Sequence, residues 1–265
     1  MNSNTARDLI GSITRCPEVA AVWNNLDGQH PCRDVVRSQN AAGPGTGFQV
    51  PEPWAGHIDR APLLFVSSNP SISRLEPYPE WDAAWDEGQT AQFFTGRFGP
   101  GPTQVKDGVY YPLKEPGPGS SGHSAKPVAY WNACKRNAEW LYGRPVTPGA
   151  DYAMTEVVHC KSRGELGVKA ARDHCAQQWF DAVLQFSPAA VIVVLGGHAR
   201  YSVQRFTFTT LAYWRPVRAE LGGRSRLVML AQHPNSRQPR RWDQHISRED
   251  RSNLQEAVTK SASSR

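Results

Sequence analysis

Three runs of apolar residues stand out along the chain, at 63–66, 189–195 and 227–231, the last within a predicted strand over 226–231, and each is followed directly by small or polar residues. Uninterrupted apolar runs of this length are typical of strands that are buried on both faces of a parallel sheet. A further strand is expected over 152–159, where apolar residues lead to Thr155 and beyond. The pattern therefore predicts four core strands, each ending in a polar turn.

Helical periodicity fills the intervals between these strands, over 128–142 and 168–186 and again after Gly196-Gly197. Alternating strands and helices predict an α/β fold with three α/β/α layers and a central, mainly parallel four-stranded sheet. We expect one domain over residues 1–265, with an irregular inserted segment at about 73–127. The polar residues 256–265 are expected to form a disordered tail.

Hydrophobic content and net charge limit the classes of function that this chain can have. The chain has 265 residues, 39% of them hydrophobic, and no apolar run is long enough to cross a membrane. No secretory signal pattern opens the sequence, so we expect a cytoplasmic protein without a membrane partner. We also expect the protein to be a monomer. The net charge is +6 and arginine outnumbers lysine, which favours a polyanionic partner, although many basic proteins have none.

Two polar residues that follow predicted strands are candidates for a common site. Asn69 precedes Pro70, which favours an extended or turn geometry for Asn69. His233 follows the last apolar run in the same way. Open α/β sheets bind ligands outside the carboxyl ends of their strands, so both side chains are expected at one crevice.

Five short motifs occur in order along the chain. They are Leu64–Ser71, Phe93–Gly99, Thr155–Cys160, Val191–Ala199 and His233–Ser236. Together they resemble the uracil-DNA glycosylase superfamily, most closely its iron–sulfur branch. The resemblance covers most of the chain as separate motifs and implies an enzyme that hydrolyses the bond between a base and its deoxyribose in DNA.

The resemblance also implies roles for individual residues. Asn69 would orient the attacking water and His233 would donate to the oxygen on which the departing base gathers negative charge, which is the transition state to be stabilised. Phe94 would stack on the flipped-out base, and Ser68 and Glu156 would contact it. The alternatives are that Asn69 forms a turn, His233 caps one and Phe94 belongs to the core.

Glu156 departs from the pattern of the iron–sulfur branch, which has asparagine there to meet uracil. An ionised carboxylate cannot donate to uracil, but it can accept from the exocyclic amine of cytosine. A protonated Glu156 could also pass its proton to the base. We therefore expect excision of a modified cytosine, with hypermodified phage DNA and antiviral defence as one setting.

Other functions remain open. One is a uracil-DNA glycosylase of base excision repair, and another is a non-catalytic module that binds modified or single-stranded DNA. A third is an enzyme that processes free nucleosides, for which the basic loop after His233 would not be needed. Glu156 could also simply be an ion-pair partner.

The resemblance makes the loop after His233 a minor-groove element. Arg237 or Gln238 would fill the space of the flipped base, while Arg240 and Arg241 would bind phosphates. A solvated basic loop is the alternative.

The chain has five cysteines and no export signal, so metal binding or simple burial of the thiols is expected rather than disulfide bonds. The resemblance implies that Cys16, Cys32, Cys160 and Cys175 hold a [4Fe–4S] cluster. The close N-terminal cysteine pair of that branch is missing here, and Cys32 is the candidate for the fourth thiolate. The alternatives are zinc, with His30 joining the cysteines, or no metal.

Overall fold

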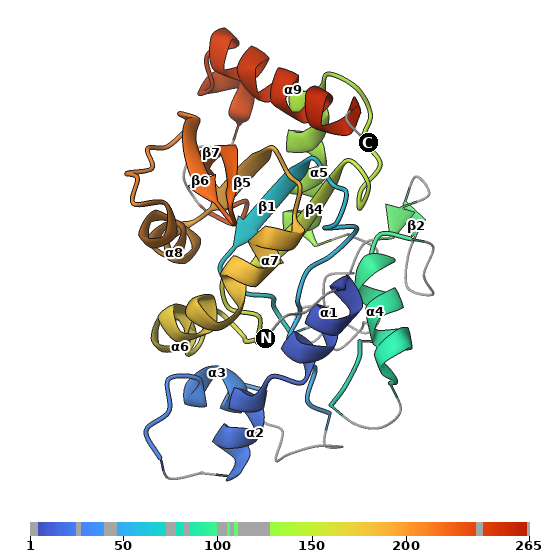
Figure 1. Ribbon diagram of the computed structural model, residues 1–265, viewed down its shortest axis with the longest axis vertical. Helices are drawn as coiled ribbons and strands as arrows, with labels where there is room; N and C mark the ends of the chain where they lie inside the picture. The colour runs from blue at the N-terminus through green and yellow to red at the C-terminus, as the bar shows by residue number, and fades with distance from the viewer. Residues whose placement is uncertain are drawn as a thin grey trace, which may run out of the picture.

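The structure is a computed structural model of the chain (Figure 1). It describes residues 5–24, 28–39, 47–72, 78–81, 85–99, 128–236 and 241–263, together with the backbone of the small antiparallel pair formed by β2 (Val105–Lys106) and β3 (Val109–Tyr110).

A five-stranded mixed sheet forms the centre of the molecule, in the order β4-β1-β5-β7-β6 (Figure 1). The first four strands in this order run parallel, and β6 is antiparallel to β7. The strands are β1 (Leu63–Ser67), β4 (Tyr152–Glu156), β5 (Val191–Leu195), β6 (Val217–Leu221) and β7 (Arg224–Ala231). The prediction of an α/β fold is confirmed, but the predicted count of four strands is wrong.

The missed strand is β6, which lies at the edge of the sheet. Its alternate residues Arg218 and Glu220 are exposed, so it carries no apolar run. A two-residue turn of Gly222 and Gly223 joins it to β7, with φ of 57° and 69°. Positive φ at both central residues is what a tight hairpin turn requires, and glycine adopts it readily.

Helices cover both faces of the sheet. Residues 168–186 form one continuous helical stretch, as predicted, but it contains a π-helical turn at Ala176–Phe180. The helical segments are α1 (Ala6–Thr14), α2 (Pro17–Asn24), α3 (Arg33–Arg37), α4 (Glu87–Thr95), α5 (Ala129–Tyr142), α6 (Val168–Cys175), α7 (Asp181–Phe186), α8 (Gly197–Thr207), a 3-10 turn (Trp242–Gln244) and α9 (Arg248–Ser263).

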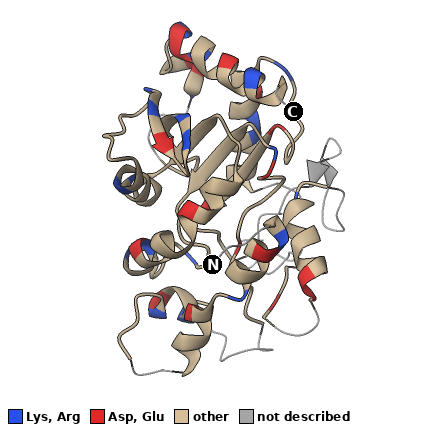
Figure 2. Cartoon of the chain, in the orientation of Figure 1, with Lys and Arg blue, Asp and Glu red and all other residues tan. Residues whose placement is uncertain are grey.

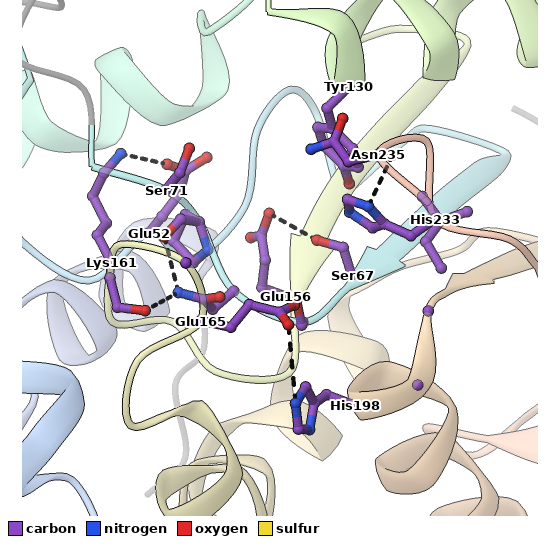
Figure 3. Close-up of a pocket in the computed structure, with 18 of the residues that line it drawn as sticks. Glu52, Ser67, Ser71, Tyr130, Glu156, Lys161, Glu165, His198, His233 and Asn235 are labelled. Carbon is purple, nitrogen blue, oxygen red and sulfur yellow. Dashed lines mark hydrogen bonds and ion pairs between the residues drawn. The ribbon is translucent and has the colours of Figure 1, made fainter. Parts of the chain in front are cut away.

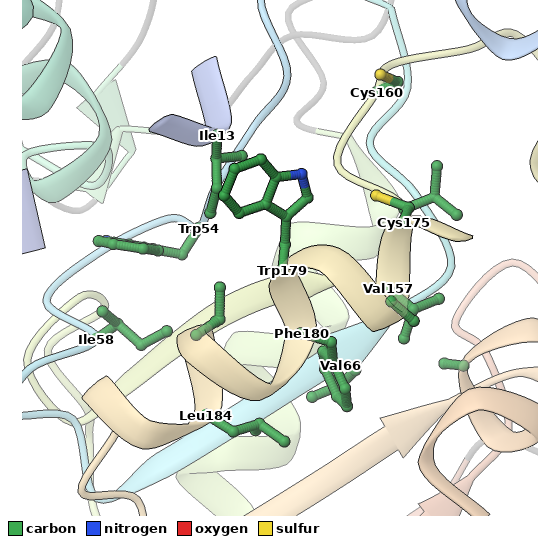
Figure 4. Close-up of a cluster of buried hydrophobic side chains, with 14 of the residues drawn as sticks. Ile13, Trp54, Ile58, Val66, Val157, Cys160, Cys175, Trp179, Phe180 and Leu184 are labelled. Carbon is green, nitrogen blue, oxygen red and sulfur yellow. The ribbon is translucent and has the colours of Figure 1, made fainter. Parts of the chain in front are cut away.

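Two apolar clusters, one on each face, hold the layers together. Alternate residues of a strand point to opposite faces, so Leu64 and Val66 of β1 pack with α1, α6, α7 and α8, whereas Leu63 and Phe65 pack with α5 and α9. Figure 4 shows part of the first cluster, with Phe180 and Leu184 against the sheet. β1 and β5 contain no charged residue, and charge lies on helices, on loops and on the edge hairpin of β6 and β7 (Figure 2).

The inserted segment and the C-terminal tail can now be compared with their predictions. The inserted segment 73–127 lies largely outside the described residues, which include 78–81, 85–99 and the β2–β3 backbone. Residues 256–263, expected to be disordered, continue α9, whose Leu254 and Val258 are buried. No helix among the described residues is long and apolar enough to cross a membrane.

The buried side chain of Arg226 in β7 links α7, β5 and β6 through hydrogen bonds. Its side chain is 1% exposed, and it donates to the carbonyl oxygens of Leu184 and Ser187 at the end of α7, of Ala189 before β5, and of Leu221 at the end of β6. The last carbonyls of a helix have no partner within it, and a cation is favourable there. Arg226 therefore fixes the end of α7 against the sheet.

Replacing Arg226 with Met should reduce the free energy of unfolding by about 3 kcal/mol or more, because buried carbonyl groups lose a charged donor. Urea denaturation followed by circular dichroism measures this change. Arg218→Met on the exposed face of β6 is the matched control and should change stability by less than about 0.5 kcal/mol. Equal effects of the two substitutions would contradict the conclusion that the hydrogen bonds of Arg226 stabilise the fold.

Candidate functional site

A cavity of about 830 Å³ opens at the carboxyl ends of the four parallel strands (Figure 3). The residues that follow β1, β5 and β7, and the last residue of β4, all contribute to its lining. This is the edge at which open α/β sheets bind ligands. Four residues predicted from the sequence line it together: Ser68, Asn69, Glu156 and His233. The expected convergence of Asn69 and His233 on one cavity is therefore confirmed.

Asn69 is held in place by its amide nitrogen. Nδ2 donates to Ser162 Oγ at 2.9 Å and to the carbonyl oxygen of Pro70 at 3.0 Å, and it lies 3.4 Å from that of Cys160. These contacts tie the loop after β1 to the loop after β4. They fix the plane of the amide group at the wall of the cavity.

His233 is a neutral hydrogen-bond donor in the lining of the cavity. The backbone N–H of Asn235 donates to Nδ1 at 3.2 Å, which leaves the proton of the neutral ring on Nε2. The ring stacks on Tyr130, with centroids 5.3 Å apart and planes 12° apart. Burial lowers the pKa of His233 below 6.5, and the negative charge of Glu165 opposes that shift. The imidazole is thus uncharged at neutral pH.

Glu156 ends β4 and is 4% exposed. Its Oε1 lies 3.5 Å from Ser67 Oγ, and its Oε2 has no hydrogen-bond partner among the described residues. Burial, followed by the negative charge of Glu52, raises the pKa of Glu156 well above 4.5. In its protonated form, Glu156 offers one donor and one acceptor to the cavity.

Glu52 keeps its charge because cations surround it. Its Oε2 accepts a hydrogen bond from Tyr78 at 3.2 Å, and lies 3.4 Å from Lys161 Nζ and 3.7 Å from Arg97. Burial alone would raise the pKa of Glu52, but Arg97 and Lys161 outweigh burial and lower it. Sequence reasoning missed this buried group, because nothing in the spacing of Glu52, Arg97 and Lys161 links them.

Ser68 lies at the cavity but is engaged by another side chain. Its hydroxyl donates to Glu165 Oε1, and Glu165 Oε2 lies 4.0 Å from His198 Nε2. Arg172 in turn lies 3.5 Å from His198 Nδ1. Glu165 has φ of 60°, which costs a non-glycine residue about 1–2 kcal/mol. Sequence reasoning missed Glu165, because its place in a basic turn gives no sign of its contact with the β1 loop.

The prediction that Phe94 stacks on a ligand does not fit the structure. Phe94 is fully buried and lies on the inner face of α4, against Tyr78 and Phe93. The aromatic residues that line the cavity are Trp131 and Tyr130 of α5, together with Tyr201 of α8. The alternative that Phe94 is a core residue is the one the structure supports.

Of the residues predicted to contact DNA, Arg237, Gln238 and Arg240 lie outside the described residues. Arg241 is described and is exposed, and its guanidinium pairs with Asp243 at 2.6 Å. Arg241 is absent from the lining of the cavity.

The four cysteines named as cluster ligands are buried and carry free thiols: Cys16, Cys32, Cys160 and Cys175. They are near enough to affect one another electrostatically. Burial raises the pKa of Cys160, and electrostatic interactions with Cys16, Cys175 and Cys32 raise it further. Burial and then the interaction with Cys16 raise the pKa of Cys32 to about 12. Figure 4 shows Cys160 and Cys175 at one end of the apolar cluster.

Among the described residues, the cysteines do not form a group tight enough for a single metal ion. The group that does is Glu18, His30 and His174. Glu18 Oε2 lies 2.7 Å from His30 Nε2 and 3.3 Å from His174 Nε2. Because the N–H of Cys32 donates to His30 Nδ1, the proton of neutral His30 is on Nε2 and faces Glu18. A metal ion would have to displace that proton.

Fold and site together define an α/β protein with a five-stranded, mostly parallel sheet and a polar pocket at the carboxyl ends of its strands. Comparison with known proteins gives no further assignment: no family model matches the chain, and no curated protein matches it significantly.

Glu156 should be protonated at pH 7. The infrared difference between the parent protein and Glu156→Gln should contain the carbonyl stretch of a protonated carboxyl group. Glu52→Gln should lower the pKa of Glu156, because it removes a neighbouring negative charge. The exposed Glu220 is the control, since Glu220→Gln should remove only ionised-carboxylate bands. Ionised bands alone for Glu156 at pH 7 would contradict the assignment.

Proposed function

We propose that the protein is a DNA glycosylase that hydrolyses the N-glycosidic bond of a flipped-out, cytosine-type base. The observation that carries the proposal is the meeting of His233, Asn69 and the buried carboxyl group of Glu156 at one cavity, where burial and the charge of Glu52 raise the pKa of Glu156. The motif resemblance points to the same reaction class. The net positive charge of +6 suits a polyanionic substrate.

The three residues match the charges that the reaction creates. Cleavage of the glycosidic bond leaves negative charge on the base and positive charge on the sugar. His233 offers its Nε2–H to the base, where a preorganised donor in a desolvated site is most effective. Asn69 holds a water through its side-chain oxygen on the other side of the sugar. Glu156 donates its proton to the base as the bond breaks.

The state of Glu156 favours a cytosine edge. A neutral carboxyl group can accept from the exocyclic amine of cytosine and donate to its ring nitrogen. Protonation at that nitrogen improves a poor leaving group. The same carboxyl could donate to a uracil oxygen, so uracil stays the alternative substrate. The cavity of about 830 Å³ has room for a base with a bulky substituent, which favours modified cytosines and, with them, a role in defence against phage.

Contacts to DNA outside the cavity are assigned to the loop after His233. Arg237 or Gln238 would occupy the space that the flipped base leaves, and Arg240 and Arg241 would bind phosphates. Arginine side chains suit this task because their forked geometry matches phosphate oxygens.

We also propose that the four buried thiols bind a [4Fe–4S] cluster. Each thiolate of such a cluster binds a different iron, so the ligands can stand farther apart than around one ion. The burial of four free thiols that influence one another fits this group better than a single zinc ion. When bound, the cluster would supply a structural link between the N-terminal region, β4 and α6.

Purified protein should release a modified cytosine from DNA, identified by mass spectrometry of the bases freed from oligonucleotides with cytosine, hydroxymethylcytosine, its glucosylated form or uracil. His233→Ala should reduce the single-turnover rate by about 10²-fold or more, because an oxyanion donor is lost. DNA affinity should persist in this variant.

The companion variant is Glu156→Asn, which should favour uracil over cytosine-type bases, because an amide cannot protonate the base. Brisk uracil release by the parent protein, with none from modified cytosines, would contradict the cytosine assignment. DNA binding with no base release from any substrate would identify a binding module instead.

Protein purified without oxygen should be brown and contain iron and acid-labile sulfide in equal amounts. Cys160→Ser should lose both, since a thiolate ligand is missing. Cys134→Ala is the control, because Cys134 is a buried thiol of α5 in the other apolar cluster, and its iron content should equal that of the parent. A colourless parent that holds stoichiometric zinc would refute the cluster.

A further inference from the structure

We infer that Glu165 is the general base of the proposed hydrolysis and takes the proton of the water that attacks the sugar carbon. This inference rests on the proposed glycosylase function and adds a catalytic residue to it. Asn69 can orient a water, but an amide has no useful acid–base chemistry at neutral pH. A carboxylate beside Asn69 would supply what the amide lacks.

Three carboxyl groups line the cavity within the described part of the chain, and two have surroundings that exclude this role. Glu52 is 4% exposed, and its carboxylate already accepts a hydrogen bond from Tyr78 and forms ion pairs with Lys161 and Arg97. Glu156 is equally buried, and burial and the charge of Glu52 raise its pKa well above 4.5, which favours its protonated form and the role of a proton donor. Glu165 is the remaining carboxyl group.

Glu165 also lies where a base is needed. Its side chain is 50% exposed, so water reaches it. Ser68, the neighbour of Asn69 in the chain, donates to Oε1 and holds the carboxylate against the water-orienting loop. His198 faces Oε2 from the other side at 4.0 Å. Figure 3 shows the Glu165 side chain between Glu156 and His198 at the pocket.

Two further observations tie Glu165 to the reacting centre. Its φ of 60° is a conformation that persists in a non-glycine residue only when its surroundings enforce it, and such residues cluster at functional sites. Its charge also reaches His233, where it opposes the effect of burial on the imidazole. Glu165 and His233 also both line the cavity, so the carboxylate and the donor to the base share one site.

The reaction balances with these groups alone. The water oxygen bonds to the sugar C1′ as the C1′–N bond breaks, and the electron pair of that bond leaves with the base. Glu165 receives the proton of the water, and Glu156 gives its proton to the base. The products are the free base and an abasic sugar, and solvent exchange through the exposed Glu165 restores both carboxyl groups.

The test is single-turnover excision of the base that the parent protein releases, by parent, Glu165→Gln, Glu165→Ala and Glu220→Gln. Glu165→Gln should be slower by about 10²-fold or more, the contribution of a general base, with DNA affinity within about threefold of the parent. Added formate should partly restore the rate of Glu165→Ala, since it replaces the missing carboxylate. Glu220→Gln, on the exposed face of β6, should match the parent.

An active parent with a Glu165→Gln rate within about threefold of it would overturn this inference and leave the proposed function intact. A slow Glu165→Ala variant that formate does not restore would also overturn it, since Glu165 would then act only in holding the Ser68 loop. A parent that releases no base from any DNA would remove the proposed function and this inference together.

Discussion

Two carboxyl groups buried next to each other, Glu52 and Glu156, determine what the pocket can do. Two negative charges in a poorly solvated site repel each other, so the ionised form is favoured for one group, whose pKa is lowered, and the protonated form for the other, whose pKa is raised. The cations decide which is which, because Arg97 and Lys161 lie against Glu52. If they faced Glu156 instead, the pocket would present a carboxylate to its ligand and lose its acid.

The parallel arrangement of β4, β1, β5 and β7 supplies the walls of this site. Four strands that end at one edge bring together loops from distant parts of the chain. The loops after β1 and β4 are fixed to each other by two contacts: Asn69 donates to Ser162, and Ser68 donates to Glu165. The apolar strands are thus needed for function only as supports that set the positions of polar ends.

The sequence predicted most of the sheet because its strands are buried on both faces and appear as apolar runs. It missed β6, where exposed residues alternate with buried ones, although the Gly222-Gly223 pair was a usable hairpin signal. Asn69 and His233 could be predicted because each lies two residues after the end of an apolar strand. Glu52 and Glu165 could not, because their roles arise from contacts between segments far apart in the sequence.

The segment 160–165 joins the buried thiols to the pocket. Cys160 supplies a thiol on one side, and its carbonyl oxygen lies 3.4 Å from the amide of Asn69. The next residues act in turn on the pocket: Lys161 pairs with Glu52, Ser162 accepts from Asn69, and Glu165 accepts from Ser68. A metal cluster held by Cys160 would therefore fix the segment that orients the amide, sets the charge of Glu52 and carries the exposed carboxylate. Its contribution to activity would be mechanical, through the positions of these side chains, without any contact between the cluster and the base.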